Sequence, residues 1–261
     1  MRFRLVALLL AGPVVGLVVI PEPRPAGGCA PVPKRGEFAE VASETAVIIW
    51  DAPARTQHFI RSASFSSTSA ELGFLVPTPT KPELAEASDE TFQLLAALTA
   101  PRETRERRAK PFGCGGLPPE EPAAGVRVLD RKRVGAYDAA VLRADDPGEL
   151  RRWLADNGYD ARPELEGWLA AYTAKKWVVT AFKIAAGATS AGQPAGKSGR
   201  LAIDGSAVRM SFRAERPFFP YREPGYPPPD GRRAERLLRV YVLADARYEG
   251  SVGDGPTGWP G

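Results

Sequence analysis

Short runs of β-branched and aromatic residues, each ended by proline or a turn sequence, constrain the fold of this chain most strongly. Residues 45–50 form such a run and are followed by Asp-Ala-Pro, which predicts a strand and then a turn. Residues 57–65 alternate loosely between apolar and polar side chains, as a half-buried antiparallel partner does. Residues 73–76 predict a third strand, ended by Pro77 because proline cannot donate to a sheet. The first part of the chain is therefore predicted to be antiparallel strands.

The rest of the chain continues this pattern. Later strands are predicted at residues 126–129, 134–142, 177–184, 207–212 and 237–243. Strands and helices do not alternate strictly, and no fixed-period repeat is present. The predicted fold class is therefore α+β, with a mainly antiparallel sheet and a few packed helices.

Three segments carry helical signals. In the clearest segment, Asp146 is suited to cap the helix N-terminus, Pro147 takes the first helical position and Glu149 the third. Asn157-Gly158 is a typical sequence for the end of a helix. The other two have apolar residues at spacings of three and four. The predicted helices lie near residues 89–99, 147–157 and 163–173.

The N-terminus has the pattern of an export signal. Two arginines in the first four residues precede residues 5–20, which carry no charge. This apolar run is shorter than the roughly 20 residues of a comfortable membrane span. We expect residues 1–28 to be a signal peptide cleaved between Gly28 and Cys29. A retained N-terminal membrane anchor is the alternative.

Cleavage would leave a single α+β domain, residues 29–250, and a flexible C-terminal tail, residues 251–261. The two cysteines of the chain, Cys29 and Cys114, are expected to form a disulfide in an oxidising compartment. One alternative is a lipid on Cys29 with Cys114 free. Another is that both cysteines are unpaired. Membrane contact is expected only through the signal segment or such a lipid.

Composition excludes several classes of function. Thirty-five Lys and Arg are nearly balanced by 31 Asp and Glu, so the chain lacks the single-sign field of a nucleic-acid binder. One histidine and two cysteines cannot build a structural zinc site or a multi-histidine metal centre. Residues 192–198 resemble a phosphate loop but have three residues between the glycines instead of four. No metal, cofactor or nucleic-acid partner is expected.

No catalytic set can be located either. His58 is the only histidine, and Ser62 on the same predicted strand would lie about 13 Å away. A partner for His58 would have to come from another strand. We expect His58 to be a surface or edge-strand histidine without a catalytic role. The remaining question is whether a pocket gathers His58 with Asp51, Glu71 or Asp138.

Two segments have surface character. Residues 102–110 contain five cations and two glutamates; a solvated face is expected, and contact with anionic envelope polymers or lipids is the alternative. Four aromatic residues lie in a proline-rich segment and are expected to fold over the core, with an exposed sugar- or peptide-binding platform as the alternative. These residues are Phe218, Phe219, Tyr221 and Tyr226.

Residues 137–159, with support from residues 72–79 and 211–217, resemble the signature of a bacterial family designated domain of unknown function 2330. The resemblance covers almost the whole chain after the signal. It implies an exported protein with cysteines near its mature N-terminus, but no assigned activity and no catalytic residues. Many such proteins have a C-terminal membrane helix, whereas this chain ends in a glycine- and proline-rich sequence.

These features predict an exported cell-envelope protein, either secreted or at the cell surface, of unknown biochemical activity. A non-enzymatic binding or structural domain is favoured, with an envelope component as its partner. The alternative is an envelope hydrolase with dispersed carboxylates. Two carboxylates within about 5–10 Å across a deep cleft would favour the hydrolase, and a shallow site would favour binding.

Overall fold

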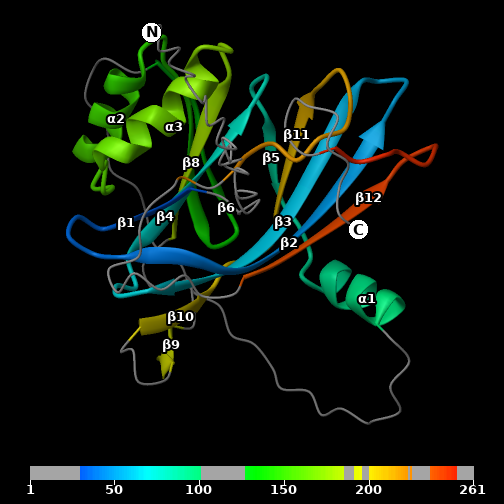
Figure 1. Cartoon of the computed structure of the whole chain (residues 1–261), viewed down its shortest axis with the longest axis horizontal. Helices are drawn as coiled ribbons and strands as arrows, with labels where there is room; N and C mark the ends of the chain where they lie inside the picture. Colours follow the sequence, from blue (N-terminus) through cyan, green and yellow to red (C-terminus); the bar gives the residue numbers. More distant parts are fainter. Residues whose placement is uncertain are drawn as a thin grey trace, which may run out of the picture.

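The computed structural model describes residues 30–100, 127–184, 191–195, 200–222, 224 and 236–251. These residues form two sheets and three helices (Figure 1). The five-stranded sheet has the order β1 (Ala30–Pro33), β4 (Leu72–Thr78), β8 (Val178–Ile184), β7 (Tyr137–Arg143) and β6 (Arg127–Val134). The helices are α1 (Glu90–Thr99), α2 (Pro147–Asp156) and α3 (Pro163–Thr173).

The seven-stranded sheet is branched. Its main path runs β12 (Leu237–Leu243), β2 (Ala39–Asp51), β3 (Thr56–Ser67), β10 (Arg200–Asp204) and β9 (Ala191–Ala195). Strand β11 (Val208–Arg213) pairs with the first half of β3 and carries β5 (Glu83–Glu86) on its other side. Three strands, β12, β9 and β5, are therefore edges of this sheet.

The two sheets pack face to face around an aromatic core. The Phe74 ring of β4 stacks on Phe182 of β8 at 4.8 Å and on Phe65 of β3 at 5.8 Å, so it joins the two sheets. The opposite face of the five-stranded sheet is covered by α2 and α3 (Figure 1), whose buried residues include Leu154 and Leu169. Strand β4 is consequently buried along its whole length. Among the described residues, no pair of helices covers the outer face of the seven-stranded sheet.

The α+β fold class and the mainly antiparallel pairing are confirmed. Among the described strands, only β12 and β2 pair in parallel. The three helices lie where the sequence predicts them, and in α2 the Asp146 side chain accepts a hydrogen bond from the Glu149 N–H at 2.9 Å. That contact is the predicted N-cap.

Other predictions are corrected. Strand β4 continues through Pro77, which is paired with Val179. The predicted strand at 134–142 is split, because Gly135 at φ +57° forms a tight turn between β6 and β7. The predicted loop at 185–199 contains β9. Strands β1, β5, β9 and β10 were not predicted, since short strands of four or five residues carry little sequence pattern.

Candidate functional site

Several predicted features lie outside the residues that the structure describes. These are the cleavage site at Gly28 and Cys29, the cysteine pair Cys29 and Cys114, the charged run 102–110, and Tyr226. Signal cleavage, the disulfide and lipidation at Cys29 therefore stay predictions. Of the predicted tail at 251–261, only Ser251 is described.

His58 finds its partner on a neighbouring strand. Its Nδ1 lies 2.8 Å from Ser211 Oγ, because His58 of β3 and Ser211 of β11 are directly paired. Both side chains are half-buried on the outer face of the seven-stranded sheet. Among the described residues, no carboxylate contacts the other ring nitrogen, so the acid that orients the base in a hydrolytic triad is missing from this pair.

The three carboxylates considered with His58 are dispersed. Asp51 accepts a hydrogen bond from the Ala54 N–H in a turn at 2.9 Å, and Glu71 forms an ion pair with Lys34 at 3.5 Å. Asp138 lies on β7 in the other sheet. None of the three lines the hollow between β5 and β6 or the hollow between α1 and β12.

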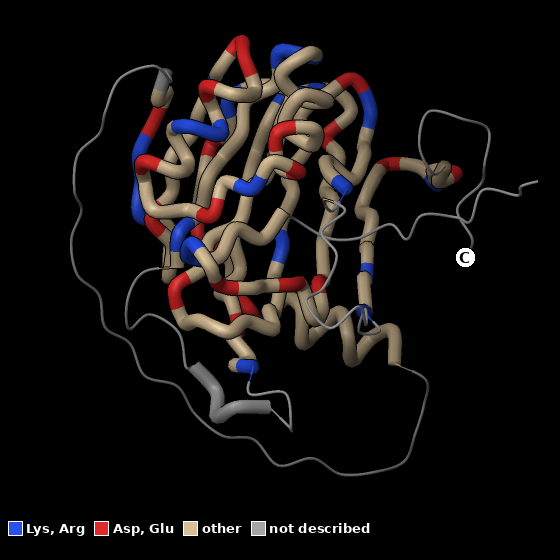
Figure 2. The backbone as a smooth tube through the Cα atoms, turned by 60° about the vertical axis from the view of Figure 1, so that its left-hand side comes forward, with Lys and Arg blue, Asp and Glu red and all other residues tan. Residues whose placement is uncertain are grey.

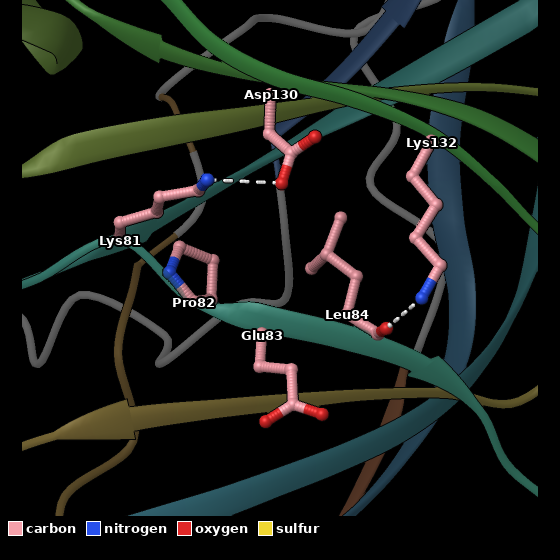
Figure 3. Close-up of a pocket in the computed structure, with 6 residues that line it drawn as sticks. All are labelled: Lys81, Pro82, Glu83, Leu84, Asp130 and Lys132. Atoms are coloured by element: carbon pink, nitrogen blue, oxygen red, sulfur yellow. Dashed lines mark hydrogen bonds and ion pairs between the residues drawn. The ribbon is translucent and has the colours of Figure 1, made fainter.

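One of those hollows does contain two carboxylates (Figure 3). It has a volume of about 280 Å³ and lies between β5 and β6. Asp130 is engaged by Lys81 at 3.0 Å, and Glu83 points to the other side of β5, away from Asp130. The Lys132 ammonium donates to the Leu84 carbonyl at 2.9 Å. The two acids do not face each other across a deep cleft, which is the arrangement that glycoside hydrolysis requires.

The proline-rich aromatic segment folds over the core, as expected. Phe218 and Phe219 are partly buried against the core cluster, and Tyr221 is buried. The Gln57 side chain exchanges two hydrogen bonds of 2.9 Å with the Phe218 backbone, and Tyr221 donates to the buried Glu44 carboxylate. For these three aromatics, the alternative of an exposed binding platform is therefore wrong.

Helix α1 is the clearest anomaly in the structure. It is rich in apolar residues on every side and carries one charge, Glu90, yet none of its residues is buried. Leu94 and Leu98 are 61% and 71% exposed. A helix that is apolar all round is normally surrounded by protein. By contrast, charges of both signs are spread over the body of the molecule (Figure 2).

Strand β12 lies beside α1 and is also exposed. The Thr99 Oγ1 of α1 lies 3.1 Å from the Tyr241 hydroxyl of β12, and the two elements share an open hollow of about 360 Å³. This hollow is lined by Thr45, Phe92, Gln93, Ala96, Arg239 and Tyr241. Three apolar side chains of β12 are about half exposed: Leu237, Val242 and Leu243.

We call this combined area the α1–β12 surface. Its exposed apolar side chains are Leu94, Leu98, Leu237, Val242 and Leu243. Because its hollow is open and its exposed apolar side chains project from a helix and an edge strand, the surface is suited to contact with another macromolecule rather than to enclosing a small molecule.

The sequence predicted both elements but not their exposure. The apolar spacing of residues 92, 95 and 98 is the same for a buried and an exposed helix. Which strand lies at an edge depends on pairing between distant segments, here residues 237–243 with residues 43–49. No local signal reports that pairing.

The described residues contain no cluster of His, Cys, Asp and Glu that could hold a metal ion. No helix among them is long and apolar enough to cross a membrane.

No curated protein and no solved structure matches the chain. A family model does match it, over residues 23–254. Since this match covers most of the chain, the protein belongs to the family described as an uncharacterized protein conserved in bacteria (DUF2330).

Proposed function

We propose that this is an exported cell-envelope protein without enzymatic activity that binds a protein partner through the α1–β12 surface. The observation that carries the proposal is the edge of β12, which pairs with no described strand other than β2 and is flanked by exposed apolar side chains on both faces of the strand. Such an edge accepts an extended strand of a partner, which adds main-chain hydrogen bonds to the sheet.

The other edges of the two sheets are protected against such pairing. Strand β1 contains Pro31 and Pro33, and β9 contains Pro194. Strand β5 has only four residues, and Glu83 and Glu86 are exposed on it. Strand β6 carries a run of charged residues and a break in its register. Prolines, charges, bulges and short length are the devices by which proteins block edge pairing.

Strand β12 has only one of these devices, the charge of Arg239. Its seven residues, LLRVYVL, contain no proline, and the only charge is on Arg239. Its pairing with β2 runs without interruption from Leu237 to Leu243. An exposed, regular and apolar edge is an aggregation hazard unless a partner covers it. This contrast within one molecule supports a binding role for β12.

Export is supported by the N-terminal sequence alone: two cations, an uncharged apolar run and a stretch of small residues before Cys29. N-terminal sequencing of the protein recovered from the cell envelope or medium tests it. A chain that begins at Cys29, or within two residues of it, is expected. Intact Met1 on a protein found only in the cytoplasm would overturn the export part of the proposal.

The binding part is tested by photo-cross-linking in bacterial cells that produce the protein. A photo-reactive residue at Leu94 is expected to give a protein adduct, and Val242→Lys should abolish it, because an added charge on the edge strand disfavours pairing of β12 with a strand of the partner. The same probe at the exposed Arg152, on α2, serves as the matched control. No adduct at Leu94, or an adduct that is insensitive to Val242→Lys, contradicts the proposal.

A further inference from the structure

We infer that the strand accepted by β12 is the β12 of a second copy of this chain, joined in an antiparallel, two-fold symmetric pair. The inference rests on the proposed function and names its partner. It is carried by the side-chain pattern of β12, which is complementary to itself when the strand is reversed.

Symmetry restricts the arrangement. Two identical edges can form one continuous antiparallel sheet only around a two-fold axis normal to that sheet. Opposed residues then lie on the same face, since side chains alternate along a strand. The axis must pass beside one residue, which is opposed to its own copy.

An axis at Val240 uses the whole strand. It opposes Leu237 to Leu243 on the outer face and Leu238 to Val242 on the inner face. The half-exposed Leu237 and Leu243 therefore meet each other, and the half-exposed Val242 meets Leu238. Burial of this apolar area is the main driving force of such a contact.

The single charge of the strand is also accommodated at this register. Arg239 is opposed to Tyr241 of the second copy, a pairing that allows the guanidinium to lie over the ring. An axis at Arg239 would instead place two arginines directly opposite, which is unfavourable. An axis at Tyr241 would leave Leu237 without a partner in the strand. The register centred on Val240 is thus favoured.

Helix α1 extends the contact. Arg239 and Tyr241 line the hollow that β12 shares with α1. Because a two-fold axis normal to the sheet keeps both outer faces on the same side, the hollows of the two copies would lie near each other across the axis. The exposed Leu94 and Leu98 would then flank the same face of the joined sheet.

Analytical ultracentrifugation of the purified protein, from cells that produce the full chain, tests the inference first. The unmodified chain is expected to sediment as a concentration-dependent dimer. Val242→Lys places a charge opposite Leu238 of the second copy and should raise the dissociation constant at least about tenfold. Val242 is 52% exposed, so the variant should keep its circular dichroism spectrum. A monomeric unmodified chain, or a dimer unaffected by Val242→Lys, overturns the inference.

Cysteine cross-linking tests the register, in a background with Cys29→Ser and Cys114→Ser. Val240→Cys should form an intermolecular disulfide, because opposed residues lie about 4.5–5.5 Å apart between Cα atoms. Leu237→Cys is more exposed than Val240 but would lie roughly 20 Å from its own copy and should not cross-link. A variant that carries both Leu237→Cys and Leu243→Cys should form an intermolecular disulfide, because these two positions oppose each other across the axis. Cross-linking of Leu237→Cys alone, with none at Val240→Cys, overturns the proposed register.

The two proposals fail separately. A monomeric protein whose Leu94 probe still cross-links to a different protein, in a manner sensitive to Val242→Lys, overturns self-pairing and leaves the proposed function standing. A monomeric protein without any Leu94 adduct overturns both.

Discussion

At the scale of single residues, Gly73 shows how closely α2 and the five-stranded sheet approach. A Cβ atom at this position would lie 2.5 Å from the Phe182 carbonyl oxygen and 2.5 Å from Cε1 of Tyr159. Tyr159 is buried directly after α2, and burial, followed by the nearby Asp138, raises the pKa of its hydroxyl. Gly73 and Tyr159 belong to two of the segments that carry the family resemblance, and here they are in contact.

Gly73→Ala is therefore expected to lower the free energy of unfolding by about 1–3 kcal/mol through overpacking. One of the two clashing atoms belongs to the backbone and cannot move aside. Urea denaturation measures the effect. Gly167→Ala in α3 is the matched control, since nothing lies within 4 Å of its added Cβ, and it should be neutral or slightly stabilising. Equal effects of the two substitutions would show that the contact at Gly73 is not tight.

A second residue-scale feature is the ion pair between the sheets. Arg61 and Glu44 are 1% and 2% exposed, and Arg61 Nε lies 2.9 Å from Glu44 Oε1. The guanidinium also lies 4.3 Å from the centre of the Phe74 ring. Both charges are thus buried between the sheets, where each depends on its neighbours for stabilisation.

Glu44→Gln is expected to lower the free energy of unfolding by about 3–5 kcal/mol, because it removes the carboxylate that faces a buried guanidinium. The double variant Glu44→Leu with Arg61→Met should recover much of that loss, since it removes both charges. Chemical denaturation of the single and double variants measures this. A double variant that is less stable than Glu44→Gln would contradict this expectation. It would show that the ion pair itself stabilises the fold, beyond cancelling the cost of burying each charge.

At the scale of elements, α1 is attached mainly by its ends. At its start, the Asp89 side chain accepts a hydrogen bond from the Ala207 N–H at 3.1 Å. At its end, Thr99 contacts Tyr241. Burial raises the pKa of the Asp89 carboxyl, and the hydrogen bond from Ala207 opposes this rise.

A carboxyl with a higher pKa in the folded than in the unfolded protein binds its proton more readily when folded. Its contribution to stability is present below the pKa that the carboxyl has in the unfolded protein. This contribution is lost as the pH rises through the pKa that the carboxyl has in the folded protein. Asp89→Asn removes this titration and keeps an oxygen that can accept from Ala207. The stability of the variant relative to the unmodified protein is therefore expected to increase from roughly pH 3 to pH 7.

Urea denaturation at several pH values measures this difference. Asp204→Asn, at an exposed position on β10, is the control for the loss of one negative charge. A difference for Asp89→Asn that falls as the pH rises would contradict the expected sign.

At the scale of the whole molecule, Cys29 would join the N-terminus of the mature chain to the segment between α1 and β6 if it forms a disulfide with Cys114. These residues are 85 positions apart, and the bond would stabilise the fold by roughly 4–5 kcal/mol in the chain-entropy model. Mass spectrometry of the exported, unreduced protein is expected to show a deficit of about two daltons, the two hydrogens lost when the bond forms. Several hundred extra daltons on the N-terminal peptide would indicate a lipid instead, and an alkylatable thiol at Cys114 without lipid would indicate no bond.

The sequence by itself determined the elements whose signals are local. The Asp146 cap, the first-position prolines of α2 and α3, and the apolar runs of β2, β3 and β12 each act through neighbours a few residues away. Helix α3 and strand β12 consequently have the predicted bounds, and the α+β class follows from the order of the elements.

Only the tertiary structure decided which of these elements meet and which stay exposed. His58 gains Ser211 from a strand 153 positions away, and Pro77 stays in a strand because β8 pairs with it. Phe92 and Leu95 of α1 have the spacing of a buried helix, yet α1 has no buried residue. Apolar spacing specifies a face, but the surface that covers it comes from distant segments or from another molecule. The exposed β12 edge is a property of the assembled sheet and is therefore absent from any short stretch of sequence.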